Sequence, residues 1–242
     1  MKRVSGISGP GYDFSGDELE EFQALLYRRV IPLDATTTAF VVVDMQKGFL
    51  DEGAALRVPG GGDLIPVING VSRACRRLGV PVVFTQFVYD PRIPTIFGEL
   101  HPEHKPPRPG RPAGLGFPSG CCLLGDPSTE IHPGIEREAS DYVLVKSGYD
   151  AFYETPLDDY LRLRGIRTVM FAGVLTDVCV WHSVSGAVHR QYRPVVLRDA
   201  VGTLSAEANR SALNSLGWSV ARILTAGQAV SELEESAARG GR

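Results

Sequence analysis

Cysteine is scarce in this chain of 242 residues, which contains only Cys75, Cys121, Cys122 and Cys179. Four cysteines in a chain this long do not make a disulfide framework, and no two of them form a Cys-x-x-Cys pair. We expect the first three to be packing residues, because Cys75 falls in an amphipathic helix pattern and Cys121 and Cys122 are adjacent in a loop. A reducing, cytoplasmic setting fits this composition best.

An excess of positive charge and a long apolar run are also missing. The chain has 25 basic and 28 acidic side chains, which leaves no net positive charge to attract nucleic acid or an anionic membrane. The longest early apolar run, Ala39–Val43, is far shorter than the roughly 20 residues that cross a bilayer. Because Met1–Tyr12 has no apolar stretch of the kind found in signal peptides, we expect neither secretion nor membrane insertion.

The five histidines show no metal-ligand spacing. His101 and His104 lie in a proline-rich segment, where we expect solvated loop residues. The Gly60–Gly62 run has the spacing of neither a dinucleotide-binding nor a phosphate-binding loop. The sequence therefore predicts no metal and no cofactor.

From residue 39 onward, short apolar strands alternate with helix patterns. This alternation is typical of βαβ units, and the near-continuous Val, Ile and Phe content suits strands that are covered on both faces. The sequence predicts an α/β fold, a three-layer α/β/α arrangement with a six-stranded, mainly parallel sheet. The expected strands are Ala39–Asp44, Pro81–Gln86, Tyr142–Lys146, Thr168–Ala172, Pro194–Arg198 and Ala221–Thr225.

The stretches between these strands contain residues that typically begin and end helices. The expected helices run from Asp63 to Gly79, from Thr155-Pro156 to Gly165, from near Asp177 to about Tyr192, and from Ser205 to Leu216, before Gly217.

Two segments fall outside this alternation. Residues 1–35 are predicted to be an N-terminal extension, in which Glu18–Arg29 has the pattern of a surface or interface helix, ahead of one domain over residues 36–242. The Pro- and Gly-rich residues 90–127 are too long for an ordinary connection, and we interpret them as a cover over the active site.

Ligands of parallel sheets bind at the carboxyl ends of the strands, and three residues with reactive side chains stand at this edge of the predicted sheet. Asp44 ends the first strand, Lys146 ends the third, and Cys179 lies in the first turn of the helix after the fourth. Each has an ordinary alternative: a turn-capping aspartate, a solvated lysine and a small buried cysteine. Together they predict a nucleophilic site, in which the helix N-terminus and a nearby ammonium are expected to lower the pKa of Cys179.

Three longer motifs surround these residues: TAFVVVDMQKGFL (Thr38–Leu50), YVLVKSGYDAFYETPLDDYLRLRGI (Tyr142–Ile166) and TVMFAGVLTDVCVWHSVSGAVHRQY (Thr168–Tyr192). They resemble the isochorismatase-like cysteine hydrolases, a group that includes nicotinamidases and N-carbamoylsarcosine, ureidoacrylate and biuret amidohydrolases. The likeness runs from about residue 36 to 230, with the three motifs in the expected order and spacing.

The resemblance implies specific roles for residues of this chain. Asp44, Lys146 and Cys179 match the catalytic triad of the group, and its cis peptide bond maps onto Val174–Leu175. The backbone N–H groups of Leu175 and Cys179 are then expected to form an oxyanion hole. The resemblance also implies assembly as a homodimer or homotetramer.

Two further comparisons with the group narrow the predicted chemistry. Nicotinamidases carry an Asp-x-His-x-x-His metal cluster after the second strand, but Thr85–Ile93 reads TQFVYDPRI and has no histidine. True isochorismatases lack the nucleophilic cysteine. We therefore expect a cysteine-dependent amidohydrolase that cleaves a small amide, ureido or carbamoyl substrate through a covalent acyl-enzyme.

Two alternatives stay open at the level of sequence. The first is vinyl-ether hydrolysis of the isochorismatase type, in which Asp44 acts as an acid and the cysteine is dispensable. The second is a non-catalytic binding module on the same fold.

The residues that flank the three reactive positions are candidates for the substrate pocket, with plain core packing as the alternative for the aromatic ones. The aromatic candidates are Phe49, Tyr89, Tyr149, Phe152 and Trp181, and the polar ones are Gln46 and Arg92.

Overall fold

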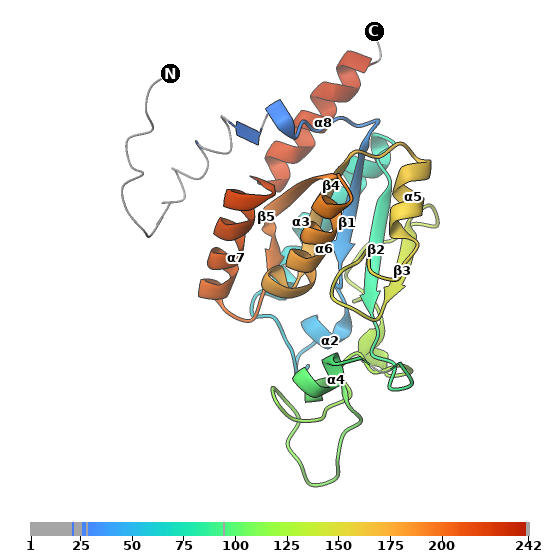
Figure 1. The fold of residues 1–242 in the computed structure, drawn as a ribbon, viewed down its shortest axis with the longest axis vertical. Helices are drawn as coiled ribbons and strands as arrows, with labels where there is room; N and C mark the ends of the chain where they lie inside the picture. The colour runs from blue at the N-terminus through green and yellow to red at the C-terminus, as the bar shows by residue number, and fades with distance from the viewer. Residues whose placement is uncertain (1–20, 22–25, 28, 94, 241–242) are drawn as a thin grey trace.

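A computed structural model describes residues 21, 26–27, 29–93 and 95–240, and it contains a six-stranded sheet in the order β3-β2-β1-β4-β5-β6 (Figure 1). All strand pairings in this sheet are parallel, so the predicted α/β fold is confirmed and the sheet is wholly rather than mainly parallel. The strands are β1 (Thr38–Val43), β2 (Val82–Phe87), β3 (Tyr142–Lys146), β4 (Thr168–Val174), β5 (Arg193–Gly202) and β6 (Arg222–Leu224).

Helices cover both faces of the sheet because the central strands are apolar on both sides (Figure 1). In β1, Phe40 and Val42 join the core under α3 and α8, whereas Val41 and Val43 join the core under α5, α6 and α7. The helices are α3 (Gly61–Arg77), α5 (Leu157–Leu163), α6 (Trp181–His189), α7 (Ala206–Ser219) and α8 (Ala226–Gly240).

Two helix predictions need correction. Helix α7 does not stop before Gly217 but continues to Ser219, because Gly217 is a buried helical residue and not a terminating residue of positive φ. Helix α8 was not predicted at all. Its apolar residues Ala229 and Leu233, four positions apart, pack into the core on the α3 side.

The segment over residues 90–127 has short structured pieces, α4 (Phe97–Leu100) and a 3₁₀ turn at Pro102–His104. It folds back on the domain, since Tyr89 and Leu123 form a parallel bridge and Cys121 and Cys122 are buried. The expected helix over Glu18–Arg29 lies largely outside the described residues. Within the described part of the chain, no helix combines the length and apolar character that crossing a bilayer requires.

The strand order reverses direction at β1, which lies between β2 and β4. The chain first builds outward from β1 to β2 and β3, then returns to place β4 on the other side. Crevices at such reversal points, beyond the carboxyl ends of the strands, are where open α/β sheets bind ligands. Asp44 directly follows β1, and Val43 pairs in register with Gly173 of β4.

Candidate active site

Asp44 is held at the carboxyl end of β1 by the neighbouring strand β2. Its backbone N–H donates to Oγ1 of Thr85 at 3.1 Å, and the Thr85 hydroxyl donates to Asp44 Oδ1 at 2.6 Å. The backbone of Asp44 has φ of 49°, a left-handed conformation that aspartate tolerates better than most residues. The carboxylate is fully buried, so its direction is set by these contacts.

Lys146 reaches Asp44 across β2. It ends β3 in register with Phe87, and its Nζ lies 2.7 Å from Asp44 Oδ2, 3.0 Å from Gly148 O and 5.2 Å from the centre of the Phe87 ring. Burial alone lowers the pKa of Lys146, but the negative charge of Asp44, followed by the interaction with Cys179, outweighs it and raises the pKa above the ordinary lysine value. The side chain is therefore a buried ammonium.

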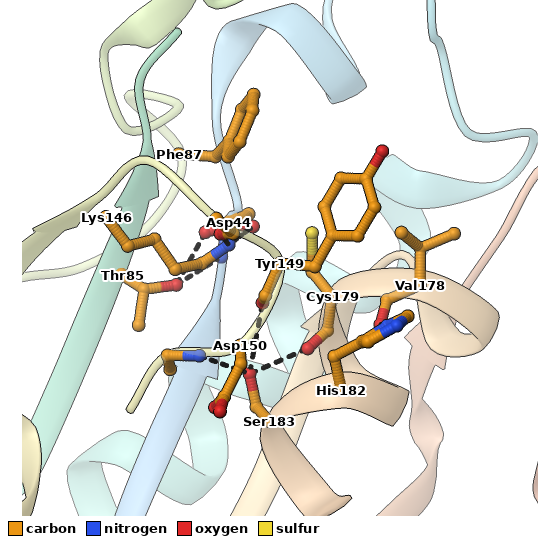
Figure 2. A network of polar contacts seen from close by, with 12 residues as sticks. Asp44, Thr85, Phe87, Lys146, Tyr149, Asp150, Val178, Cys179, His182 and Ser183 are labelled. Carbon is orange, nitrogen blue, oxygen red and sulfur yellow. Dashed lines mark hydrogen bonds and ion pairs between the residues drawn. The ribbon is translucent and has the colours of Figure 1, made fainter. Parts of the chain in front are cut away.

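Cys179 enters the same site from β4, in a π-helical turn over Thr176–Val180 that precedes α6. The peptide bond between Val174 and Leu175 is cis. The thiol interacts with both Asp44 and Lys146. Figure 2 shows the three side chains converging from β1, β3 and the turn after β4.

The expected low pKa of Cys179 is wrong for this arrangement. Burial raises the pKa of Cys179 to about 12; Lys146 acts to lower it, but Asp44 raises it further. A helix N-terminus lowers the pKa of a thiol that is partly solvated, whereas Cys179 is only 4% exposed. The resting site therefore contains a protonated thiol.

Gly173 permits β4 to approach β1 closely enough for this convergence. Its φ is 106°, and a Cβ at this position would lie 2.0 Å from the carbonyl oxygen of Val43. Only glycine fits such a contact.

Ser183 connects the helix that carries the cysteine to the loop that follows Lys146 (Figure 2). Its hydroxyl donates to Cys179 O at 2.7 Å and accepts the N–H of Ala151 at 3.0 Å. This link holds the turn Thr176–Val180 against the loop that follows β3.

The backbone around Cys179 is also organised. The N–H groups of Val178 and Val180 both donate to Leu175 O, at 3.1 and 3.0 Å. The N–H of Leu175 donates no hydrogen bond to another described residue.

A pocket of about 100 Å³ opens onto Cys179. Most of its walls are apolar, and the polar lining groups are two histidines, a tyrosine, an aspartate and a threonine. The lining residues are Phe49, Leu56, Phe87, His101, His104, Leu115, Tyr149, Leu175, Asp177, Val178, Cys179, Thr203 and Leu204.

Two of the seven predicted pocket residues, Phe49 and Tyr149, line this pocket. Gln46 does not, because its amide is fully used by backbone groups: Nε2 donates to Phe87 O and Thr129 O, and Oε1 accepts the N–H of Phe87. Arg92 does not either, because its side chain is 77% exposed and pairs with Asp90 at 2.7 Å.

The other three predicted pocket residues pack elsewhere. The Tyr89 side chain lies against Gly98 and stacks 6.0 Å from the ring of His104. Phe152 is buried against the ring of Tyr192, and Trp181 packs on the core under α5, α6 and α7. For these three residues the alternative of ordinary packing applies.

The prediction for the two loop histidines was also wrong. His101 and His104 were expected to be solvated, yet both line the pocket and His104 is buried. The 3₁₀ turn folds inward, where the His104 ring lies 5.0 Å from that of Phe87 and its Nδ1 lies 2.7 Å from Cys121 O. Among the described residues, no three His, Cys, Asp or Glu side chains group as a metal site.

Sequence reasoning missed one residue that contacts the reactive group directly, Thr85. The available signal was its place near the end of β2, beside the strand that carries Asp44. It also missed Asp177 and Thr203 at the pocket, where Thr203 donates a hydrogen bond to the Asp177 carboxylate.

The chain is similar to known proteins in both sequence and fold. The chain is 32% identical over 200 residues to the ureidoacrylate amidohydrolase RutB of Methylobacterium radiotolerans, covering 78% of each chain. It superposes with a TM-score of 0.61 on N-carbamoylsarcosine amidase from Thermoplasma acidophilum, at 30% identity over 78% of this chain and 96% of that one.

A third similarity concerns the fold alone. A cysteine hydrolase from Pseudomonas syringae pv. phaseolicola 1448A aligns with a TM-score of 0.74 at 23% identity, over 85% of this chain and 96% of that one. Residues 38–228 match the isochorismatase domain, which is most of the sequence. The chain therefore belongs to the isochorismatase family.

Proposed function

We propose that this protein is a cysteine-dependent amidohydrolase that cleaves a carbon–nitrogen bond of a small amide, ureido or carbamoyl compound through a covalent acyl-enzyme. The coarser assignment, a hydrolase of non-peptide carbon–nitrogen bonds, rests on the ureidoacrylate amidohydrolase relatives. The observation that carries the finer proposal is the buried Asp44–Lys146 ion pair, which interacts with the thiol of Cys179 beside a pocket.

The first step is proton transfer from Cys179 to Asp44. The raised pKa of Cys179 keeps the sulfur protonated at rest, so the thiolate forms only as the carboxylate takes the proton. Lys146 stays charged, because the pKa of its ammonium is raised, and it stabilises the negative charge as that charge moves from oxygen to sulfur.

The sulfur then attacks the substrate carbonyl carbon. The N–H groups of Leu175 and Cys179 stabilise the resulting oxyanion, a role for which the Leu175 N–H is available. Protonated Asp44 gives its proton to the departing nitrogen, so the carbon–nitrogen bond breaks and ammonia or an amine leaves. Asp44 then takes a proton from a water molecule, which attacks the thioester or thiocarbamate carbon and breaks its bond to sulfur. Asp44 returns this proton to the sulfur.

The segment over residues 90–127 acts as the cover of this site in our proposal. His101, His104 and Leu115 belong to it and line the pocket. A volume of about 100 Å³ suits a substrate of only a few heavy atoms beyond the reacting group. Exclusion of bulk water by the cover strengthens the electrostatic interactions in the site and favours attack by the sulfur.

The proposal is tested by ammonia release from biuret, ureidoacrylate, N-carbamoyl amino acids, maleamate and nicotinamide. We expect turnover of at least one compound, its loss in Cys179→Ala, and its retention in Cys75→Ala, a matched control in the core under α3. Mass spectrometry of the quenched enzyme should show an adduct on Cys179.

Two outcomes would contradict the proposal. Isochorismate cleavage that survives in Cys179→Ala identifies a vinyl-ether hydrolase in which Asp44 is the acid. Compounds that bind and protect Cys179 from alkylation without being hydrolysed identify a binding module.

A further inference from the structure

A buried carboxylate with one unpartnered oxygen atom lies next to residues that line the pocket. Glu103, in the 3₁₀ turn Pro102–His104, is 2% exposed, and its Oε2 makes no hydrogen bond with the described residues. Burying a carboxylate oxygen without a donor is costly, so such a group is usually satisfied by a ligand or an ion. Glu103 is not itself a lining residue, but His101 and His104 of the same segment line the pocket.

A second unpartnered polar atom faces the same region. The hydroxyl of Tyr149, a pocket residue, is buried and has no hydrogen-bond partner among the described residues. Burial, and then the interactions with Cys179 and Glu103, raise the pKa of Tyr149, so its hydroxyl stays neutral.

A second acidic group lines another part of the pocket. Asp177 is exposed and accepts a hydrogen bond from Thr203. The described residues that line the pocket include no lysine or arginine. The ammonium of Lys146 is already paired with Asp44, and the guanidinium of Arg92 points into solvent.

Among the described lining residues, no permanently charged cation offsets these carboxylates. Burial lowers the pKa of His101; Glu103 acts to raise it and His104 to lower it. The rings of Phe49, Phe87 and Tyr149 contribute aromatic faces, which attract cations and not anions. The pocket is therefore apolar with an excess of negative charge.

We propose that this pocket selects amides and ureides whose end remote from the scissile bond is an ammonium or an uncharged donor group, and discriminates against a carboxylate at that end. Glu103 and Asp177 are the specificity-determining residues, and the Tyr149 hydroxyl assists Glu103. The inference rests on the proposed function and deepens it. It also separates this chain from relatives named for ureidoacrylate, a substrate that carries a carboxylate.

Three alkylureas that differ only in the end group provide the test: 3-ureidopropionate, 3-hydroxypropylurea and 3-aminopropylurea. Each releases ammonia by the same bond cleavage, so differences in kcat/KM report the end group alone. We expect the ammonium and hydroxyl compounds to exceed the carboxylate by about tenfold or more, the effect of one close charge in a partly buried site. Equal rates, or a preference for the carboxylate, overturn the inference.

Variants that remove one negative charge test which residues cause the preference for the ammonium compound. Glu103→Gln and Asp177→Asn should each reduce the preference for ammonium over carboxylate by about threefold or more. Because Asp177 is exposed, its variant tests the idea even where Glu103→Gln disturbs folding. The matched control is Glu136→Gln, an exposed glutamate paired with Arg73, which should leave the ratio unchanged. Ratios that stay at the wild-type value in both pocket variants contradict the assignment.

Failure of this inference is distinguishable from failure of the proposed function. A carboxylate-preferring enzyme that still depends on Cys179 retains the function and loses only the inference. If none of the three ureas is hydrolysed, the same compounds are compared as protectants of Cys179 against iodoacetamide. Best protection by the ammonium compound supports the inference, and best protection by the carboxylate overturns it.

Discussion

Lys146 Nζ lies 2.7 Å from Asp44 Oδ2, and neither side chain is accessible to solvent. An ion pair in this position is costly to desolvate and contributes little net stability compared with an apolar pair of the same shape. Because stability does not account for the pair, we propose that it has a chemical role, in which Asp44 takes a proton and Lys146 stays charged.

Removing one partner of the Asp44–Lys146 pair should lower the free energy of unfolding more than removing both charges. We expect Lys146→Met to destabilise the fold by about 3–5 kcal/mol, because it leaves the Asp44 carboxylate buried and uncompensated. Adding Asp44→Asn should recover a large part of that loss, since asparagine also tolerates the positive φ. Urea unfolding of both variants and the wild type measures the difference, and equal stability of the single and double variants would falsify this account.

The thiol of Cys179 should stay protonated over the ordinary pH range. Because the pKa of Cys179 is raised to about 12, the rate of its alkylation by iodoacetamide should rise steadily from about pH 7 to about pH 10, past the ~8.5 of a free cysteine. The same shift predicts falling stability above about pH 8.5, where the unfolded chain loses the proton and the folded chain keeps it. A plateau in alkylation below neutral pH indicates a preformed thiolate and contradicts the expectation.

Thr85 should matter for turnover out of proportion to its size. Thr85→Val keeps the shape but deprives Asp44 of a donor to Oδ1 and an acceptor for its N–H. Each unpaired buried group costs about 1–3 kcal/mol, so we expect kcat to fall about tenfold or more. Thr85→Ser, which keeps the hydroxyl, should restore most of it. Steady-state kinetics at matched folded fractions provides the measurement, and a Val variant with wild-type kcat rules out this positioning role.

Gly173 should not tolerate a side chain. In Gly173→Ala the new Cβ meets the carbonyl of Val43 at 2.0 Å in a backbone of positive φ, so we expect a loss of about 4 kcal/mol or more. The matched control is Gly70→Ala in α3, where no atom lies within 4 Å of the added Cβ and a small gain in helix stability is expected. Thermal unfolding compares the two, and similar melting temperatures disprove the close-packing argument.

The strands were predictable from sequence because each is a compact apolar run bounded by helix or turn signals, and strands covered on both faces require such runs. The missed α8 shows the limit of this reasoning. Its Ala- and Glu-rich sequence has few large apolar residues, and its identity as a covering helix depends on the sheet face that receives Ala229 and Leu233.

The three reactive residues could be named in advance because their positions relative to strand ends are a property of the chain. Their surroundings could not. Gln46 and Thr85 both stand close to Asp44, yet the Gln46 amide is used by backbone groups while the Thr85 hydroxyl contacts the carboxylate. That difference depends on side-chain direction and strand register.

The sequence by itself determined the alternation of strands and helices, the absence of a disulfide framework and the residue types at the carboxyl ends of the strands, because these are local properties of composition and spacing. Only the tertiary structure decided that Cys179 is protonated at rest and that Glu103 lies buried beside the pocket. Both depend on how much solvent is excluded and which charges are brought close, and these quantities exist only once distant segments have packed together.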